Sequence, residues 1–109
     1  KVSELIEKLG LTAFTGAVGV EREIAGGYTS DLLSDVMGNA KEGNVWITLQ
    51  NHMNVIAIAS LKELACIILV KGITPAPEII EKAIAEEIPV LGSNENTFNL
   101  NGKIYALLN

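Results

Sequence analysis

The middle of the chain alternates between short apolar runs and segments with helical spacing. Residues 45–49 (VWITL) and 65–70 (ACIILV) have the β-branched, uninterrupted apolar character of strands that are covered on both faces of a sheet. Residues 50–64 and 77–87 carry apolar side chains at helical intervals. This order of strand, helix, strand and helix predicts right-handed βαβ crossovers, and therefore parallel strands.

The flanking parts of the chain carry weaker patterns. Apolar positions predict a helix over residues 3–9, with Ser3 as its N-cap and Gly10 as its left-handed end. Further elements are expected as extended pieces at 11–15, 22–24, 28–33 and 88–91, and as helices capped by Ser34 and Thr97. Together they predict a three-layer α/β/α fold in a single domain of residues 1–109, with a mostly parallel or mixed sheet of about four to six strands.

The apolar content of the chain leaves little spare polar surface. Hydrophobic residues make up 49% of the 109 residues, and the mean hydropathy is +0.34. No apolar run approaches the ~18 residues that a membrane-spanning helix needs, so no membrane partner is expected. Part of the apolar excess is instead expected in a subunit contact, and the nearly all-apolar segment Val55 to Leu64 suggests a homodimer.

Charge and cysteine content narrow the possible partners and the compartment. The formal net charge is −5, and the eight lysines and arginines are scattered rather than gathered in a basic stripe. Such a chain repels a phosphate backbone, so nucleic acid is not an expected partner. The single cysteine, Cys66, lies inside an apolar run, which indicates a buried thiol in a reducing, cytoplasmic compartment.

Metal and catalytic motifs are weak. Asp31 and Asp35 share a helix face only if one helix spans both, and a lone histidine with a buried cysteine completes no usual metal site. A triad could be drawn from Ser30 or Ser93 with His52, but no G-x-S-x-G nucleophile elbow occurs. No metal, no cofactor and no catalytic residue are therefore predicted.

The most distinctive polar corner follows the strand at 45–49. Ligands of parallel sheets gather outside the carboxyl ends of the strands, where the amides of a helix N-terminus attract anions. A phosphate or carboxylate could contact this corner through Thr48, Asn51, His52 and Asn54. The alternative is that Asn51 only caps the following helix and that His52 is a surface or interface residue.

Glycines and turn residues supply the other candidate contacts. Gly26 and Gly27 could bring backbone amides to a ligand, although no Walker or dinucleotide motif occurs, and a tight turn is the alternative role. Gly72 and Ser93 follow the next two strands, so parallel pairing would bring them to the same sheet edge as Thr48. They could line one shared pocket with that corner or simply form turns.

Several segments of the chain resemble stand-alone proteins of the DRTGG domain family. The segments are Lys1 to Leu9 (KVSELIEKL), Gly26 to Ala40 (GGYTSDLLSDVMGNA), Gly43 to Thr48 (GNVWIT) and Gln50 to Val55 (QNHMNV). The contiguous string Asp-Arg-Thr-Gly-Gly is missing, and the nearest stretch is Glu21 to Gly27. The resemblance implies a three-layer α/β domain related to the N-terminal domain of HPr kinase/phosphorylase. It also implies a regulatory or dimer-forming role, because catalysis in the larger proteins of this family belongs to another part of the chain.

Three functions remain open at this point. The first is a non-catalytic regulatory or scaffold module that dimerises and binds a small anionic metabolite or nucleotide. The second is an interaction subunit of a larger metabolic or redox enzyme, with no small ligand. The third is an enzyme acting on a phosphorylated or acyl substrate, which fold kinship alone does not support.

Overall fold

Five strands form one mixed sheet in the order β1-β5-β4-β3-β2 in the computed structural model, which describes residues 1–109. The strands are β1 (Thr12–Ala13), β2 (Gly26–Thr29), β3 (Asn44–Thr48), β4 (Cys66–Leu69) and β5 (Val90–Gly92). The helices are α1 (Val2–Leu9), α2 (Leu33–Asn39), α3 (Asn54–Leu61), α4 (Pro77–Ala85) and α5 (Thr97–Leu108). None of these helices is both long and apolar enough to span a membrane.

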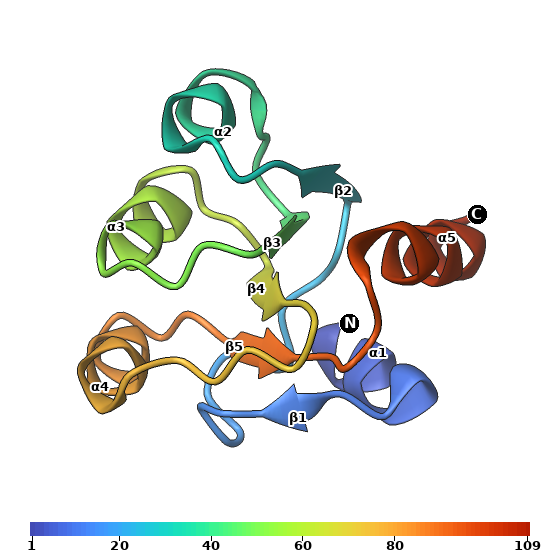
Figure 1. Cartoon of the computed structure of the whole chain (residues 1–109), viewed down its shortest axis with the longest axis horizontal. Coiled ribbons are helices and arrows are strands. Elements are labelled where there is room, and N and C mark those ends of the chain that lie inside the picture. The colour runs from blue at the N-terminus through green and yellow to red at the C-terminus, as the bar shows by residue number, and fades with distance from the viewer.

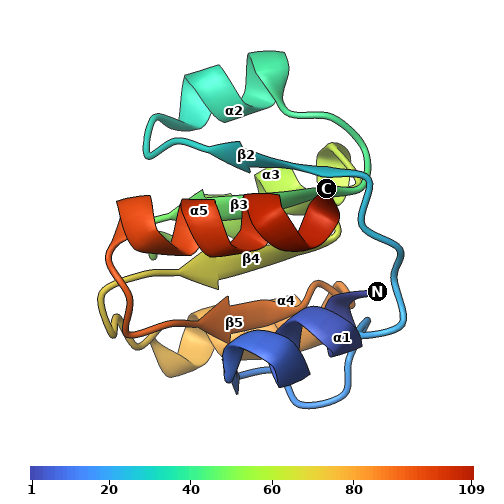
Figure 2. The ribbon, with the colours of Figure 1, turned by 90° about the vertical axis from the view of Figure 1, so that its right-hand side faces the viewer.

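Strands β2 to β5 are all parallel, as Figure 2 shows, and only the short β1 runs antiparallel, beside β5. In the central pair, Val45 lies opposite Cys66 and Trp46 opposite Ile67. The predicted parallel pairing of these strands is confirmed. Because a connection between parallel strands must return to the start of the sheet, α2, α3 and α4 join the successive parallel strands, and α5 follows β5 as the last element.

The helices cover both faces of the sheet. Helices α2, α3 and α4 lie on one face, and α1 and α5 lie on the other (Figure 1). Successive strand residues alternate between the two cores: Trp46 and Ile67 pack in the first, Val45 and Cys66 in the second. The predicted three-layer α/β/α fold is confirmed, and both faces of the central strands are buried.

The apolar segment Val55 to Leu64 serves the core of the chain itself. Val55, Ile56, Ile58 and Ala59 are buried beneath the neighbouring helices, whereas Leu61 is 69% exposed. The buried residues pack in the core on one face of the sheet, so most of the apolar character of this segment is used inside the chain. Its composition therefore does not by itself require a dimer contact.

Complete burial also determines the chemistry of Cys66. Removal from water raises the pKa of the thiol to about 12. The thiol thus stays protonated at neutral pH and packs as a small apolar group.

The predicted N-caps are wrong at several helices. Helix α1 starts at Val2, one residue before Ser3, because the Val2 and Ser3 amides donate to the carbonyl oxygens of Arg22 and Val20, at 3.0 and 2.8 Å. Backbone carbonyls of a distant loop thus do the work that a side-chain cap would do. Likewise Ser34 and Thr97 lie inside α2 and α5. Gly10 does end α1 with a left-handed φ of 61°.

The expected strand at residues 22–24 is absent. This segment is anchored instead by the hydrogen bonds of the Arg22 side chain. Its guanidinium donates to the carbonyl oxygen of Leu64 at 3.0 Å and to that of Glu87 at 2.9 Å. These carbonyls follow α3 and α4 at the edge where the parallel strands begin. One cation thus ties three separate loops together.

We expect Arg22→Ala to lower the free energy of unfolding by about 2 kcal/mol, because two charge-assisted hydrogen bonds are lost and two carbonyl oxygens lose their donors. Urea denaturation followed by circular dichroism measures the change. Lys82→Ala, which removes only an exposed ion pair with Glu86 on α4, is the control and should change stability by less than about 0.5 kcal/mol. An Arg22→Ala variant as stable as this control would contradict the structural role of Arg22.

Candidate functional site

The carboxyl ends of the four parallel strands meet at one edge of the sheet. Thr48 ends β3, while Gly72 and Ser93 closely follow β4 and β5. In Figure 2 the loops that lead from these strands to their helices lie together at the left. The predicted placement of Thr48, Gly72 and Ser93 at a common edge is therefore confirmed, although no ligand contact follows from placement alone.

Asp31 connects the loop after β2 to the end of β3 at this edge. One carboxylate oxygen accepts hydrogen bonds from the Thr48 hydroxyl at 2.9 Å and from the Leu49 amide at 2.6 Å. The Gln50 side chain donates to the Asp31 carbonyl oxygen at 3.0 Å. Thr48 is only 1% exposed, so its hydroxyl holds two loops together rather than facing solvent.

His52 lies in the loop two residues before the start of α3. Its Nδ1 accepts the Asn54 amide at 3.2 Å, and its carbonyl oxygen accepts the Val55 amide at 3.0 Å. The prediction that Asn51 caps the helix is wrong, since residues 50–53 remain a loop and α3 begins at Asn54. Both Asn51 and His52 are exposed. An anion at this corner would meet side chains, because the first amides of α3 are already bonded.

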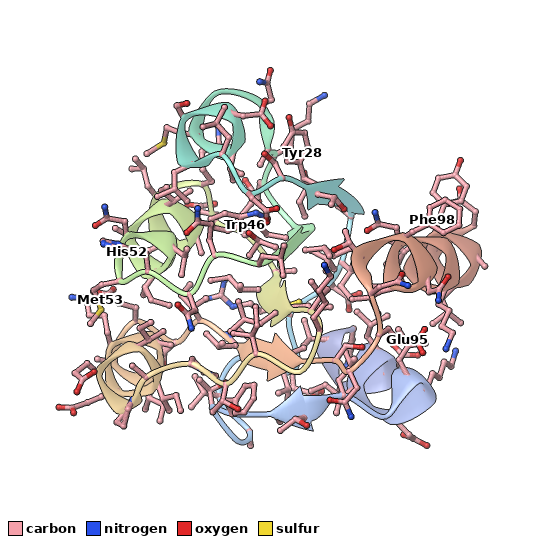
Figure 3. The ribbon with its side chains drawn as sticks, viewed as in Figure 1. Tyr28, Trp46, His52, Met53, Glu95 and Phe98 are labelled. Carbon is pink, nitrogen blue, oxygen red and sulfur yellow. The ribbon has the colours of Figure 1, made fainter.

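Gly72 and Ser93 join the ends of β4 and β5. The Gly72 amide donates to the Ser93 carbonyl oxygen at 2.9 Å, and the Ser93 hydroxyl accepts the Glu95 amide at 3.1 Å. Lys71 has a left-handed φ of 58° and forms no ion pair. Figure 3 shows Glu95 and His52 on opposite sides of the sheet. The hydrogen bonds at this edge link Gly72 with Ser93 and Asn54 with His52, and none joins the two pairs.

Gly26 and Gly27 lie at the opposite end of β2 from this edge. They pair with Asn44 and Val45 as the first residues of an edge strand, so the tight-turn alternative is wrong. Both line an open groove of about 1270 Å³ between β2 and α5. The candidate residues at the carboxyl edge do not line this groove.

Helix α5 contributes exposed aromatic side chains to this groove, which we call the α5–β2 groove. Phe98 is 85% exposed and Tyr105 is 72% exposed, whereas Leu100 and Ile104 of the same helix are buried. The Thr29 hydroxyl of β2 donates to the Asn101 side chain at 2.7 Å and fixes the helix beside the strand. The sequence reasoning missed this face, although Phe98 and Tyr105 are seven residues apart, and hence on one side of a helix, away from Leu100.

Asp35 is engaged by a neighbour on β2. Its two carboxylate oxygens accept the Tyr28 hydroxyl at 2.8 and 2.9 Å. This hydrogen bond lowers the pKa of Asp35 and raises the pKa of Tyr28. Asp31 and Asp35 therefore have different partners, and no group of three or more His, Cys, Asp or Glu side chains is placed to hold a metal ion.

Comparison with known proteins now assigns the family. The model of the DRTGG domain matches residues 24–107, most of the chain. The chain belongs to the DRTGG domain family. Both Gly26 and Gly27 lie within the matched region, whereas Arg22 lies just before it. No curated protein matches the sequence significantly.

Among solved structures, the DRTGG domain is similar to a regulatory region from Clostridium perfringens. That structure contains the CBS and DRTGG domains of a pyrophosphatase, complexed with the activator diadenosine tetraphosphate. The TM-score is 0.76 at 19% identity, and the match covers 94% of this chain and 44% of that chain. At this identity the likeness establishes the fold, and this domain spans less than half of the other chain.

We expect the Tyr28–Asp35 hydrogen bond to contribute its full stabilisation between about pH 4 and pH 10, and progressively less outside this range. The pKa of Asp35 is lower in the folded state than in the unfolded state. Its ionised carboxylate therefore stabilises the fold fully above the unfolded pKa, and this stabilisation is lost as the pH falls through the folded pKa. The raised pKa of Tyr28 means that its contribution is lost as the pH rises through the folded pKa.

Thermal unfolding of Tyr28→Phe across pH tests this window. The melting temperature should lie below that of the wild type at pH 7, and the difference should shrink at both extremes. Tyr105→Phe is the matched control, because the Tyr105 hydroxyl donates no hydrogen bond in the chain. A Tyr28→Phe difference that stayed constant from pH 3 to pH 11 would rule out the ionic character of the bond.

Proposed function

We propose that this DRTGG domain is a non-catalytic regulatory or scaffold module, that residues 1–109 act as one domain, and that it works as a homodimer in the cytoplasm. The observation that carries the proposal is the exposed aromatic face of α5 beside the α5–β2 groove. Large apolar side chains gathered at a hollow are typical of protein contact surfaces. Family membership supports a regulatory role, and the buried Cys66 thiol fits a reducing compartment.

The polar groups at the carboxyl edge support a non-catalytic role. Asp31, Ser93 and His52 each use a side-chain atom to accept a backbone amide of a neighbouring loop residue. A nucleophile also needs a neighbouring base that activates it. No hydrogen bond joins any two of these three side chains, so they form no nucleophile–base pair, and binding rather than bond breaking is the activity that they favour.

We expect sedimentation velocity at about 10 to 100 μM to show a dimer that dissociates on dilution. The mid-size apolar face favours micromolar rather than irreversible association. Raising the salt concentration should not weaken the dimer, because an apolar contact is not screened, whereas the repulsion between two copies that each carry −5 is. A monomer throughout this range would remove self-association from the proposal.

A small anionic metabolite or nucleotide at the carboxyl edge is a second element of the proposal. It is favoured by the unpaired ammonium group of Lys71 and the exposed imidazole of His52, which follow neighbouring strands. The Asp31 carboxylate lies at the same edge and restricts an anion to the side of Lys71. The pyrophosphatase region from Clostridium perfringens was solved with a dinucleotide activator, which makes nucleotides reasonable probes.

Titration with ATP and with inorganic phosphate, followed by thermal shift, tests this site. A ligand present at 100 times its dissociation constant should stabilise the domain by about 2.7 kcal/mol. Lys71→Ala and His52→Ala should reduce the shift, whereas Lys8→Ala, on α1, should not. If neither probe shifts the wild type, the anionic-ligand element fails and a scaffold role without a small ligand remains.

The alternative is an interaction subunit of a larger metabolic or redox enzyme. The same exposed face of α5 would then bind the enzyme and remain uncovered when this domain is alone in solution. A monomeric wild type that binds a purified enzyme through Phe98 would favour this alternative over the dimer.

A further inference from the structure

The α5–β2 groove has a strand for one wall and a helix for the other. Gly26, Gly27 and Thr29 of β2 form the first wall, and Ile47 of the neighbouring β3 also lines the groove. Gly27 shares the face of β2 that carries α5, and because it has no side chain the groove is open directly above the strand backbone there. β2 is also an outer strand of the sheet, so its outward backbone groups have no strand partner.

Phe98 and Tyr105 project from the same region that the groove hollows out. Both residues line the groove while remaining mostly exposed, and they lie two helical turns apart on α5. Figure 3 shows Phe98 projecting from α5 into solvent. One surface thus carries both the protruding side chains and the hollow that could receive them, which is the property that a two-fold contact between identical surfaces requires.

The charge of the groove also suits a contact between two copies of this chain. Among the residues that line it, only Glu95 and Lys103 have charged side chains, and these pair with each other at 3.1 Å. The side chains of the groove therefore carry no net charge, although the whole chain carries −5. Two copies of an acidic chain repel each other over most surfaces, but they can approach through a neutral one.

The size of the face is also that of a modest dimer contact. Phe98, Tyr105 and Leu108 expose on the order of 300 to 400 Å² of side-chain surface, judged from the 150 to 250 Å² that a buried aromatic contributes. A standard interface takes about 800 Å² from each copy. The aromatic stripe supplies about half of that area, and the remainder would come from the strand wall of the groove.

We propose that a second copy of this chain docks on the α5–β2 groove around a two-fold axis, with Phe98 and Tyr105 of each copy entering the groove of the other. This inference rests on the proposed self-association and names the surface that performs it. The β2 strands of the two copies then lie side by side across the axis. The groove is filled, and the exposed rings of α5 leave water.

The test is sedimentation velocity on surface variants compared with the wild type. The double variant Phe98→Asp with Tyr105→Asp should weaken dimerisation at least 100-fold, because four carboxylates would be brought into one apolar contact. Gly27→Leu fills the groove from the strand side and should weaken dimerisation at least 10-fold. A Cβ at Gly27 would meet only the Val45 carbonyl oxygen, at 3.7 Å, so this variant should keep the fold.

Leu61→Asp on α3 is the matched control, since Leu61 is equally exposed but lies on the other face of the sheet. This variant should dimerise like the wild type. Circular dichroism spectra should be unchanged for all variants, and Gly27→Leu keeps the test valid if the double variant unfolds.

Each outcome has a distinct meaning. A wild type that is monomeric at 100 μM would overturn the proposed self-association and this inference together. A dimer whose dissociation constant is unchanged in folded Gly27→Leu and in the double variant would overturn only the choice of surface. Equal weakening by Leu61→Asp would likewise place the contact elsewhere.

Discussion

The parallel pairing of β3 with β4 is the constraint on which the rest of this structure depends. Both strands are buried on both faces, with Trp46 and Ile67 packed in one core and Val45 and Cys66 in the other. Because their ends point the same way, helices must return the chain, and these helices provide the covering layers. The same geometry collects the polar loops at the two ends of the strands.

The two ends of the sheet are each held by one charged side chain. Arg22 binds carbonyl oxygens that follow α3 and α4, at the end where the strands begin. Asp31 binds the end of β3 at the opposite edge. Each residue lies in a loop outside the regular elements, yet each connects loops that are distant in sequence. The charged groups of Arg22 and Asp31 thus hold loops together at the two ends of the strands.

The uneven helical cover gives this DRTGG domain its most accessible surface. Three helices cover one face of the sheet and two cover the other (Figure 1). On the second face α5 lies beside β2, where Gly27 offers no side chain to fill the space. A hollow with aromatic neighbours is the physical outcome, and it is separate from the carboxyl edge.

The sequence by itself determined the central strands, the crossover order and the three-layer fold, because uninterrupted apolar runs can be satisfied only inside a covered sheet. It also placed Thr48, Gly72 and Ser93 at one edge. Only the tertiary structure decided that Gly26 and Gly27 belong to a strand, that distant carbonyls receive Arg22 and that the Phe98 face stays uncovered. These features depend on contacts between residues far apart in the chain, and the local pattern of apolar and polar residues does not specify which distant side chains will be in contact.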